Sequence, residues 1–262
     1  MTSTSVSSST STRLSGRTAL VTGSTSGIGA ATARALAAEG AVVAVSGRDV
    51  QRGAGVVDDI TGAGGRAVFV PVDLDGSYAD LRDFAARALD ALGGRVDILV
   101  NNAGIYPATS TADLPDADLD AMLAVNVRAP HVLVAELAPA MAARGQGVVV
   151  NIGSWMARTG TPFAAMYTAT KAAVEQLTRG WAAEFGPSGV RVNTVAPGAT
   201  LTPGNEAALA VLQQMTATTP AGTVIRPEDV AAAVVFVASD EARMVHGSIL
   251  HVDGGISATR MG

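Results

Sequence analysis

Short runs of β-branched residues alternate with longer alanine-rich stretches along nearly the whole chain. This alternation predicts a parallel sheet, because consecutive parallel strands must be joined by a crossover, usually a helix. Near-continuous apolar runs such as 148–150 are typical of strands buried on both faces. We therefore expect one α/β domain over 13–262, a doubly wound sheet of seven parallel strands with helices on both faces. The expected strands are 18–22, 42–46, 67–72, 97–101, 148–152, 191–196 and 248–252; the expected helices are 28–39, 50–61, 77–92, 117–143, 164–185 and 227–238.

The composition excludes several functional classes. Of 262 residues, 48% are hydrophobic and 16% charged, which suits a large core and argues against disorder. A net charge of −5 disfavours nucleic acid or an anionic membrane as partner. The absence of cysteine excludes disulfides and thiolate catalysis, and the three histidines lack metal-ligand spacing, so no metal is expected. No apolar run reaches the roughly 18 residues that a membrane span needs.

Two segments lie outside the alternating pattern. Residues 1–12 are almost entirely Ser and Thr, with no basic start or apolar segment of a secretory signal. We expect a flexible tail there and a soluble, cytoplasmic protein. The Thr-, Pro- and Gly-rich segment 198–226 is long for a connection in a compact fold, and such segments are usually functional or mobile. Its part at about 199–222 is expected to be a substrate lid, with a plain surface excursion as the alternative.

A glycine turn follows the first expected strand. Gly23, Gly27 and Gly29 are spaced by three residues and then one, just before an alanine-rich helix. Glycines allow a tight turn and close approach of a pyrophosphate, to which the helix N-terminus offers unpaired N–H groups. The spacing differs from G-x-G-x-x-G, and the turn could serve structure alone.

The end of the second strand indicates which dinucleotide would bind. A carboxylate that holds the ribose of NAD would stand about 20 residues after the glycine turn, but Gly47 occupies that place and Arg48 follows. A guanidinium can bind the 2′-phosphate of NADP(H) bidentately. We expect NADP(H) to be preferred over NAD(H), the alternative being that Arg48 is a solvated surface charge. Asp49 is expected to begin the next helix.

Polar residues also end the third and fourth strands. Asp73 could accept a hydrogen bond from adenine or cap a turn. Asn101-Asn102-Ala103-Gly104 has small residues that would let a ribose approach. The same residue types also favour a turn for structural reasons alone.

Tyr167 and Lys171 are four residues apart in a helix-like stretch, which places both side chains on one helix face. A phenol is a poor acid–base group at neutral pH, and a neighbouring ammonium favours its ionised form. Tyr-x-x-x-Lys alone is a weak motif, but the chain has 17 Arg and keeps its single Lys here. Ser154 ends the fifth strand, where its hydroxyl can bind a substrate oxygen beside Tyr167. It is not expected to be a nucleophile, because G-x-S-x-G and a clear His partner are absent.

These motifs, in this order, resemble the short-chain dehydrogenases/reductases over about residues 14–256. Their order and family-like spacing, including thirteen residues from Ser154 to Tyr167, carry the resemblance. The matching motifs are Thr22 to Gly29, Asn101 to Gly104, Asn126, Ser154, Tyr167 with Lys171, Pro197-Gly198 and Val252 to Gly255.

The resemblance implies a Rossmann-like fold and a set of roles. Tyr167 would exchange a proton with the substrate oxygen, and Lys171 would bind the nicotinamide ribose and lower the Tyr167 pKa. Ser154 would polarise the carbonyl, and Asn126 would hold a water that links Lys171 to solvent. A homotetramer, or a homodimer, is implied. The cofactor site would comprise Gly23, Ser24, Thr25, Ser26, Gly27, Ile28, Gly29, Arg48, Asp73, Leu74, Asn102, Ala103, Gly104, Tyr167, Lys171, Pro197, Gly198, Thr200 and Thr202.

We expect an NADP(H)-dependent oxidoreductase that interconverts a carbonyl and a secondary alcohol by hydride transfer. The alternatives are a silent NADP(H)-binding regulator, and an isomerase or dehydratase that uses the cofactor transiently. The candidate substrate residues are Tyr106, Trp155, Met156 and Phe163, although Trp155 and Phe163 could instead be core residues. A 3-oxoacyl thioester, a steroid, a sugar, a cyclic ketone and an aryl ketone all remain open as substrates.

Overall fold

A single sheet of seven parallel strands forms the centre of the molecule, in the order β3-β2-β1-β4-β5-β6-β7. The computed structural model describes residues 13–258, so the tail expected at 1–12 lies outside the described residues. The fold class predicted from the sequence is confirmed, and each strand boundary lies within one residue of its expected place. The strands are β1 Thr18–Val21, β2 Val42–Gly47, β3 Arg66–Pro71, β4 Ile98–Asn101, β5 Gly147–Ile152, β6 Val190–Pro197 and β7 Ile249–Val252.

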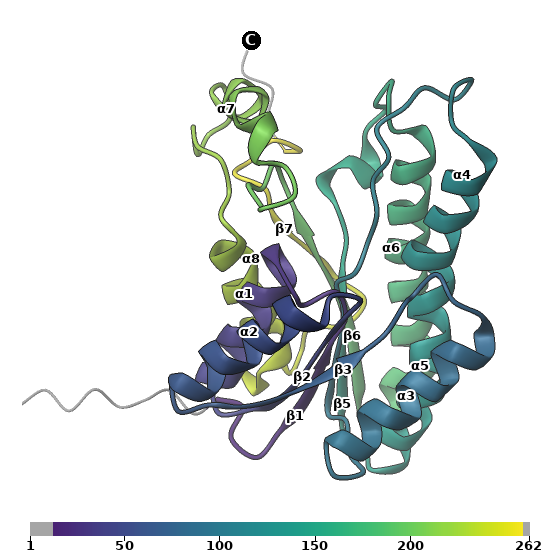
Figure 1. Ribbon diagram of the computed structural model, residues 1–262, viewed down its shortest axis with the longest axis vertical. Coiled ribbons are helices and arrows are strands. Elements are labelled where there is room, and N and C mark those ends of the chain that lie inside the picture. Colours follow the sequence, from purple (N-terminus) through teal and green to yellow (C-terminus); the bar gives the residue numbers. More distant parts are fainter. Residues whose placement is uncertain (1–12, 259–262) are drawn as a thin grey trace, which may run out of the picture.

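Helices cover both faces of the sheet, as expected. Figure 1 shows α1, α2 and α8 on one face and α3, α5 and α6 on the other. Each face has its own core of buried apolar side chains, centred on Leu36 and Val234 on the first and on Phe84 and Leu133 on the second. The helices are α1 Gly27–Ala38, α2 Val50–Gly62, α3 Tyr78–Ala91, α4 Asp116–Leu123, α5 Ala129–Ala143, α6 Ala165–Phe185, α7 Leu209–Thr216 and α8 Pro227–Ala238.

Local chemistry sets where two of the helices begin. Asp49 caps α2, because its carboxylate accepts the backbone N–H of Arg52 at 2.9 Å, as the sequence predicted. Ser77 and Asp80 form a reciprocal capping box at the start of α3. The first of these caps lies beside the cleft described below.

The helix expected over 117–143 is not regular. A π-helical turn at Ala124–Arg128 separates α4 from α5, and the N–H of Ala129 donates to the carbonyl of Ala124, five residues back. The helical stretch Asp116–Ala143 has the length of a membrane span, and its most apolar window of 18 residues has a mean hydropathy of 1.3. However, 56% of its most apolar window is buried inside the protein, as in a core helix.

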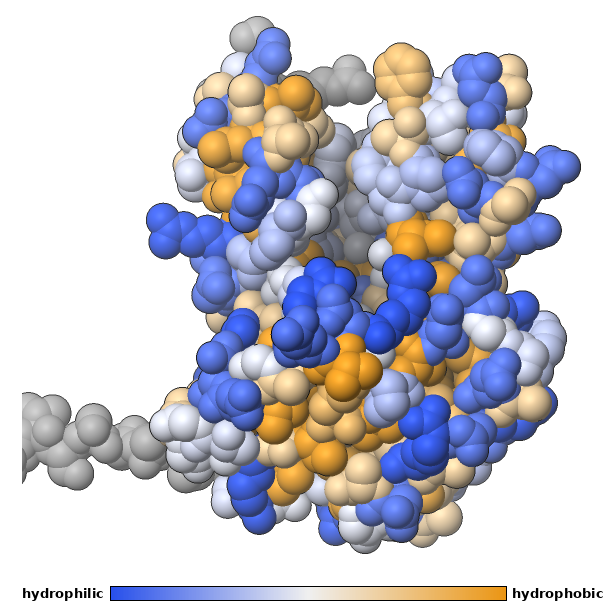
Figure 2. All heavy atoms as spheres, in the orientation of Figure 1, coloured by the Kyte–Doolittle hydropathy of each residue, from blue (hydrophilic) through white to orange (hydrophobic). Residues whose placement is uncertain are grey.

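The strand order changes direction between β1 and β4. The chain winds outward through β2 and β3 on one side, and through β5, β6 and β7 on the other. Such a switch point opens a crevice at the carboxyl ends of the strands, where ligands bind in open α/β sheets. Figure 2 shows the surface hollowed at this edge, between the lobe that carries α7 and the opposite lobe.

Candidate active site

The glycine turn after β1 is shaped for a close-approaching ligand. Gly23 and Gly27 have φ of +60° and +53°, which side chains other than glycine rarely adopt. Ser26 is the N-cap of α1, but its side chain makes no capping hydrogen bond. The N-terminus of α1 therefore faces the crevice without a side-chain cap, which suits an anionic pyrophosphate.

Asn102 fastens this turn to the end of β4. Its amide nitrogen donates to the carbonyls of Thr22 and Gly23, at 2.8 and 3.0 Å. Ser24 is fully buried, and its hydroxyl joins β1 to β2 by donating to Val21 and accepting from Ser46. Asn102 and Ser24 therefore hold the turn rigid through their side chains.

One cleft gathers about half of the predicted cofactor residues at the carboxyl ends of β1, β2, β3 and β4. It is lined by nine of the predicted positions, namely Gly23, Thr25, Ser26, Arg48, Asp73, Leu74, Asn102, Ala103 and Gly104. The lining does not include the other ten, namely Ser24, Gly27, Ile28, Gly29, Tyr167, Lys171, Pro197, Gly198, Thr200 and Thr202. Thr202 nevertheless lies against the turn, since a Cβ built on Gly27 would meet its side chain at 3.2 Å.

The cleft has a basic corner at the end of β2. Arg48 is exposed there, and Arg52 joins it from the first turn of α2, held by Asp49 at 2.7 Å. A Cβ on Gly47 would approach Thr25 to 2.8 Å, so a carboxylate side chain at 47 would collide with the glycine turn. Asp73 lines the cleft and also caps a turn, accepting the N–H of Asp75 at 3.2 Å.

Ser154, Tyr167 and Lys171 meet at the carboxyl end of β5. Lys171 Nζ donates to the carbonyl of Ile152 at 2.9 Å and lies 5.9 Å from the centre of the Tyr167 ring. A hydrogen bond joins the hydroxyls of Ser154 and Tyr167. Gly104 opens this site toward the cofactor cleft, since a Cβ there would meet Lys171 Nζ at 3.3 Å.

Burial dominates the proton affinities of the two ionisable groups. It raises the pKa of Tyr167 above its ordinary value, while the Ser154 hydrogen bond pulls that pKa down. Burial lowers the pKa of Lys171 to about 8. The lowering of the Tyr167 pKa by Lys171, which the resemblance implied, stays a prediction.

Asn126 projects from the π-helical turn into the same region and is buried. Its amide nitrogen donates to Ile105 and Thr170, and its oxygen accepts the N–H of Ile105. The partner that a buried polar residue requires is therefore present. Asn126 also lies close to Lys171, because a Cβ on Gly104 would stand 3.4 Å from its Oδ1.

Aromatic side chains stand beside Tyr167. The Tyr106 ring lies 4.6 Å from the Tyr167 ring, centre to centre, and is tilted by 49°. Phe163 is 62% exposed, so it is not a core residue, and Trp155 and Met156 are partly exposed. Tyr106 therefore places an aromatic ring beside Tyr167, and Phe163, Trp155 and Met156 have side-chain surface that a ligand could contact.

Comparison with known proteins identifies the chain. A family model described as enoyl-(acyl carrier protein) reductase matches residues 23–257. A solved structure of a short-chain dehydrogenase/reductase family protein is 49% identical, with a TM-score of 0.86, over 94% of this chain and 100% of that one. The chain belongs to the short-chain dehydrogenase/reductase family.

Two further relatives of this dehydrogenase/reductase are informative. Cis-4-hydroxycyclohexanecarboxylate dehydrogenase of Sinomonas cyclohexanicum is 41% identical, covering 92% of this chain and 97% of its own. A short-chain dehydrogenase from Burkholderia cenocepacia, solved in complex with NADP, is 41% identical, with a TM-score of 0.86 and coverage of 94% and 100%. Relatives of this dehydrogenase/reductase act on CH–OH groups.

The sequence motifs missed some residues of this dehydrogenase/reductase that border the site. Arg52 was not predicted to be a site residue. It follows the helix cap Asp49 by three residues, and this spacing would place it at the cleft. Arg158 and Glu175 were missed as well. They form an ion pair across 17 residues of sequence, for which no local spacing gives a signal.

Proposed function

We propose that this protein is an NADP(H)-dependent oxidoreductase that interconverts a carbonyl and a secondary alcohol. The observation that carries the proposal is the convergence of Ser154, Tyr167 and Lys171 next to a cleft with a glycine turn and a basic corner. A bound nicotinamide would supply or accept the hydride, and the protein would position the reactants and move the proton.

Tyr167 acts as the general acid in reduction and as the general base in oxidation. When substrate binds, Ser154 donates its single hydroxyl proton to the substrate oxygen instead of to Tyr167, while its own oxygen accepts the Met156 N–H at 3.2 Å. Lys171 has three donor hydrogens, one used on Ile152, and the others are free to hold ribose hydroxyls. Asn126 holds a water that links Lys171 to solvent, which its position beside Lys171 supports.

The cofactor site consists of the nine predicted positions that line the cleft, together with Ser24, Gly27, Ile28, Gly29, Tyr167, Lys171, Pro197, Gly198, Thr200 and Thr202. The rigid glycine turn supports this assignment, as do relatives solved with NADP. Arg48 selects NADP(H) over NAD(H) by pairing with the 2′-phosphate.

Arg48→Ala is expected to weaken NADPH binding roughly 10–100-fold, the loss of one charge-assisted contact, while NADH binding changes less than about twofold. The measurement is the Kd of each cofactor by fluorescence titration. Arg34→Ala is the matched control, because Arg34 pairs with Asp59 on the surface and does not line the cleft. Equal losses for the two cofactors would remove this role from Arg48.

The rate of alcohol oxidation is expected to rise with pH through the alkaline range. Oxidation needs an ionised Tyr167, and burial raises the pKa of that phenol. Carbonyl reduction needs the protonated phenol and should stay near its maximum at neutral pH. Initial rates in both directions across pH would show this, and an oxidation rate that falls as pH rises would contradict it.

The substrate binds among Tyr106, Trp155, Met156 and Phe163, under a lid formed by residues 199–222. The lid contains α7, which the sequence did not predict, and Val211 and Met215 are exposed on it. Apolar and aromatic surface on both sides of the cleft suits a ring-bearing or apolar substrate.

The decisive test is absorbance of NADPH and NADH with a panel of cyclohexanone, 3-oxoacyl thioesters, sugars and aryl ketones, and of NADP⁺ with cyclohexanol, rhamnose and gluconate. Turnover with NADPH favoured supports the proposal. Turnover favouring NADH would retain the enzyme class and remove the cofactor preference. Binding of NADPH without turnover of any compound would favour a regulatory role.

We further propose a cytoplasmic homotetramer or homodimer. Leu123, Val127 and Leu177 line a shallow depression on the outer face of α4, the π-helical turn and α6, and Leu123 is 42% exposed. Apolar surface of this kind is typical of subunit contacts. Light scattering during size-exclusion chromatography would measure the assembly.

A further inference from the structure

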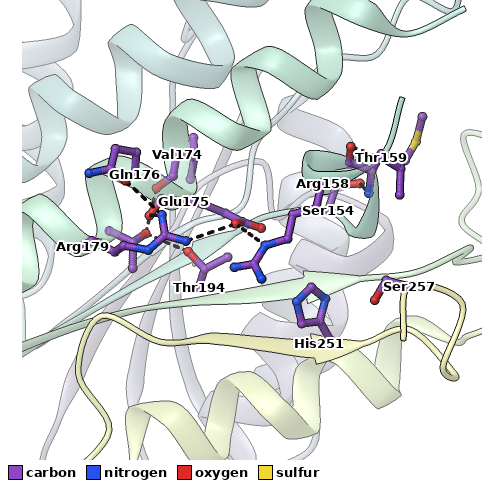
Figure 3. Close-up of polar contacts among 12 residues, drawn as sticks. Ser154, Arg158, Thr159, Val174, Glu175, Gln176, Arg179, Thr194, His251 and Ser257 are labelled. Carbon is purple, nitrogen blue, oxygen red and sulfur yellow. Dashed lines mark hydrogen bonds and ion pairs between the residues drawn. The ribbon is translucent and has the colours of Figure 1, made fainter. Parts of the chain in front are cut away.

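A buried carboxylate, that of Glu175, lies one helical turn beyond Lys171 in α6. The Glu175 side chain, in α6, is only 4% exposed, and its Oε2 is 3.0 Å from Arg158 Nε and 3.7 Å from an Arg179 nitrogen. Figure 3 shows Glu175 between the two guanidinium groups. Its Oε1 is buried and has no hydrogen-bond partner among residues 13–258, so the charge is compensated through Oε2 alone.

The two arginines differ in what they connect. Arg179 lies one turn along α6 from Glu175, so their contact stays within one helix. Arg158 instead ends the short 3₁₀ turn Trp155–Arg158 that follows β5. The Arg158–Glu175 contact therefore ties two separate elements together.

Ser154 begins the same 3₁₀ turn. Its hydroxyl oxygen accepts the N–H of Met156 at 3.2 Å, and its carbonyl accepts the N–H of Ala157 at 3.0 Å. Ser154 and Arg158 are thus the two ends of one hydrogen-bonded unit. Fixing Arg158 restricts where the Ser154 hydroxyl can lie.

At the other end of the ion pair, Glu175 follows Lys171 by one helical turn and Tyr167 by two. Residues at this spacing share a face of the helix, and α6 is regular here. We propose that the Arg158–Glu175 ion pair is a positioning device that holds Ser154 in register with Tyr167 and Lys171. This proposal rests on the function proposed above.

The test compares Arg158→Met and Glu175→Gln with Arg179→Met as the matched control, because Arg179 contacts the same carboxylate without joining two elements. The first two variants are expected to lower kcat roughly 10–100-fold, the effect of a misplaced reacting group, with the Kd for NADPH within about twofold of wild type. Arg179→Met should retain kcat within about twofold.

A second readout separates positioning from general destabilisation. Tyr167 faces Ser154, Lys171 and Tyr106, and only the Ser154 hydrogen bond lowers its pKa. Loss of Ser154 positioning should therefore move the midpoint of the pH profile for alcohol oxidation upward in Arg158→Met and Glu175→Gln, and leave it in place in Arg179→Met. Reduced thermal stability alone would not move that midpoint.

The double variant Arg158→Met/Glu175→Gln should have a kcat no lower than the poorer single variant, because both changes remove the same contact. Arg158→Lys should recover part of the lost kcat, since it restores a cation of similar reach. Additive losses in the double variant, or equal effects of Arg158→Met and Arg179→Met, would overturn the proposal.

Failure of the proposed function can be told apart from failure of the positioning proposal. In that case wild type would turn over nothing in the panel, and crystal structures of Arg158→Met and Arg179→Met would decide the positioning question. A displaced Ser154 hydroxyl in Arg158→Met alone supports the proposal. An unmoved Ser154 refutes it whatever the activity.

Discussion

Tyr167→Phe is expected to lower kcat roughly 10²–10⁴-fold, the usual contribution of a positioned general acid, while the Kd for NADPH changes less than about threefold. The ring keeps its packing against Tyr106, so only the phenolic hydroxyl is lost. The reaction would then lack the group that protonates the substrate oxygen. Steady-state kinetics and fluorescence titration of the cofactor would measure the two quantities.

Tyr78→Phe is the matched control, because Tyr78 is an exposed residue at the start of α3 and does not line the cofactor cleft. It should leave kcat within about twofold. Retained turnover in Tyr167→Phe would instead show that another group handles the proton. Tyr106, the neighbouring phenol, would then be the first to examine.

Lys171→Met is expected to abolish most turnover and at the same time to stabilise the protein near neutral pH. Burial lowers the Lys171 pKa from 10.5 to about 8, which corresponds to an unfavourable term of about 3 kcal/mol in the charged, folded state. Methionine has a similar length and no charge, although it loses the hydrogen bond to Ile152. A net gain of roughly 1–2 kcal/mol is expected.

The difference in stability between Lys171→Met and wild type is expected to depend on pH. Below about pH 8 both the folded and unfolded proteins carry the proton on Lys171, and wild type bears the full penalty. Between about pH 8 and 10.5 the unfolded chain binds more protons, so wild-type stability from this group rises with pH. The advantage of Lys171→Met should therefore shrink across that range, as measured by urea unfolding at several pH values.

Lys171→Arg provides the contrasting variant. Arginine keeps its charge at every accessible pH and is bulkier, so it should be less stable than Lys171→Met throughout the range. If Lys171→Met were instead destabilised by the same amount at every pH, the surroundings of the Lys171 ammonium would stabilise the folded protein, and burial of the charge would not destabilise it.

The fold followed from the sequence because its signals are local. Each strand is a short apolar run, and each boundary is marked by a nearby Gly, Asp or Ser, so strand ends were placed to within one residue. The candidate site followed for a related reason. Its motifs stand at the carboxyl ends of strands, such as Ser154 after β5 and Arg48 after β2, and parallel topology alone brings those ends together.

What the sequence missed depends on contacts distant in the chain or on weak patterns. The Arg158–Glu175 pair forms only when the 3₁₀ turn after β5 packs against α6, and no pattern within either segment predicts it. Helix α7 has eight residues inside a Thr-, Pro- and Gly-rich segment, too short for its periodicity to stand out. The balance of pKa effects at Tyr167 depends on burial, which spacing does not reveal.

The π-helical turn at Ala124–Arg128 holds one residue more than a regular turn, because its hydrogen bond spans five residues rather than four. The extra residue is accommodated locally, so the helices on either side keep nearly the phase of one continuous helix. Deleting one residue from the turn would therefore close it into a regular helix and leave the stripe of α5 that includes Leu133 and Met141 in the core. The loss would fall on Asn126 and its hydrogen bonds to Ile105, so a change of chain length here would damage the site and spare the core.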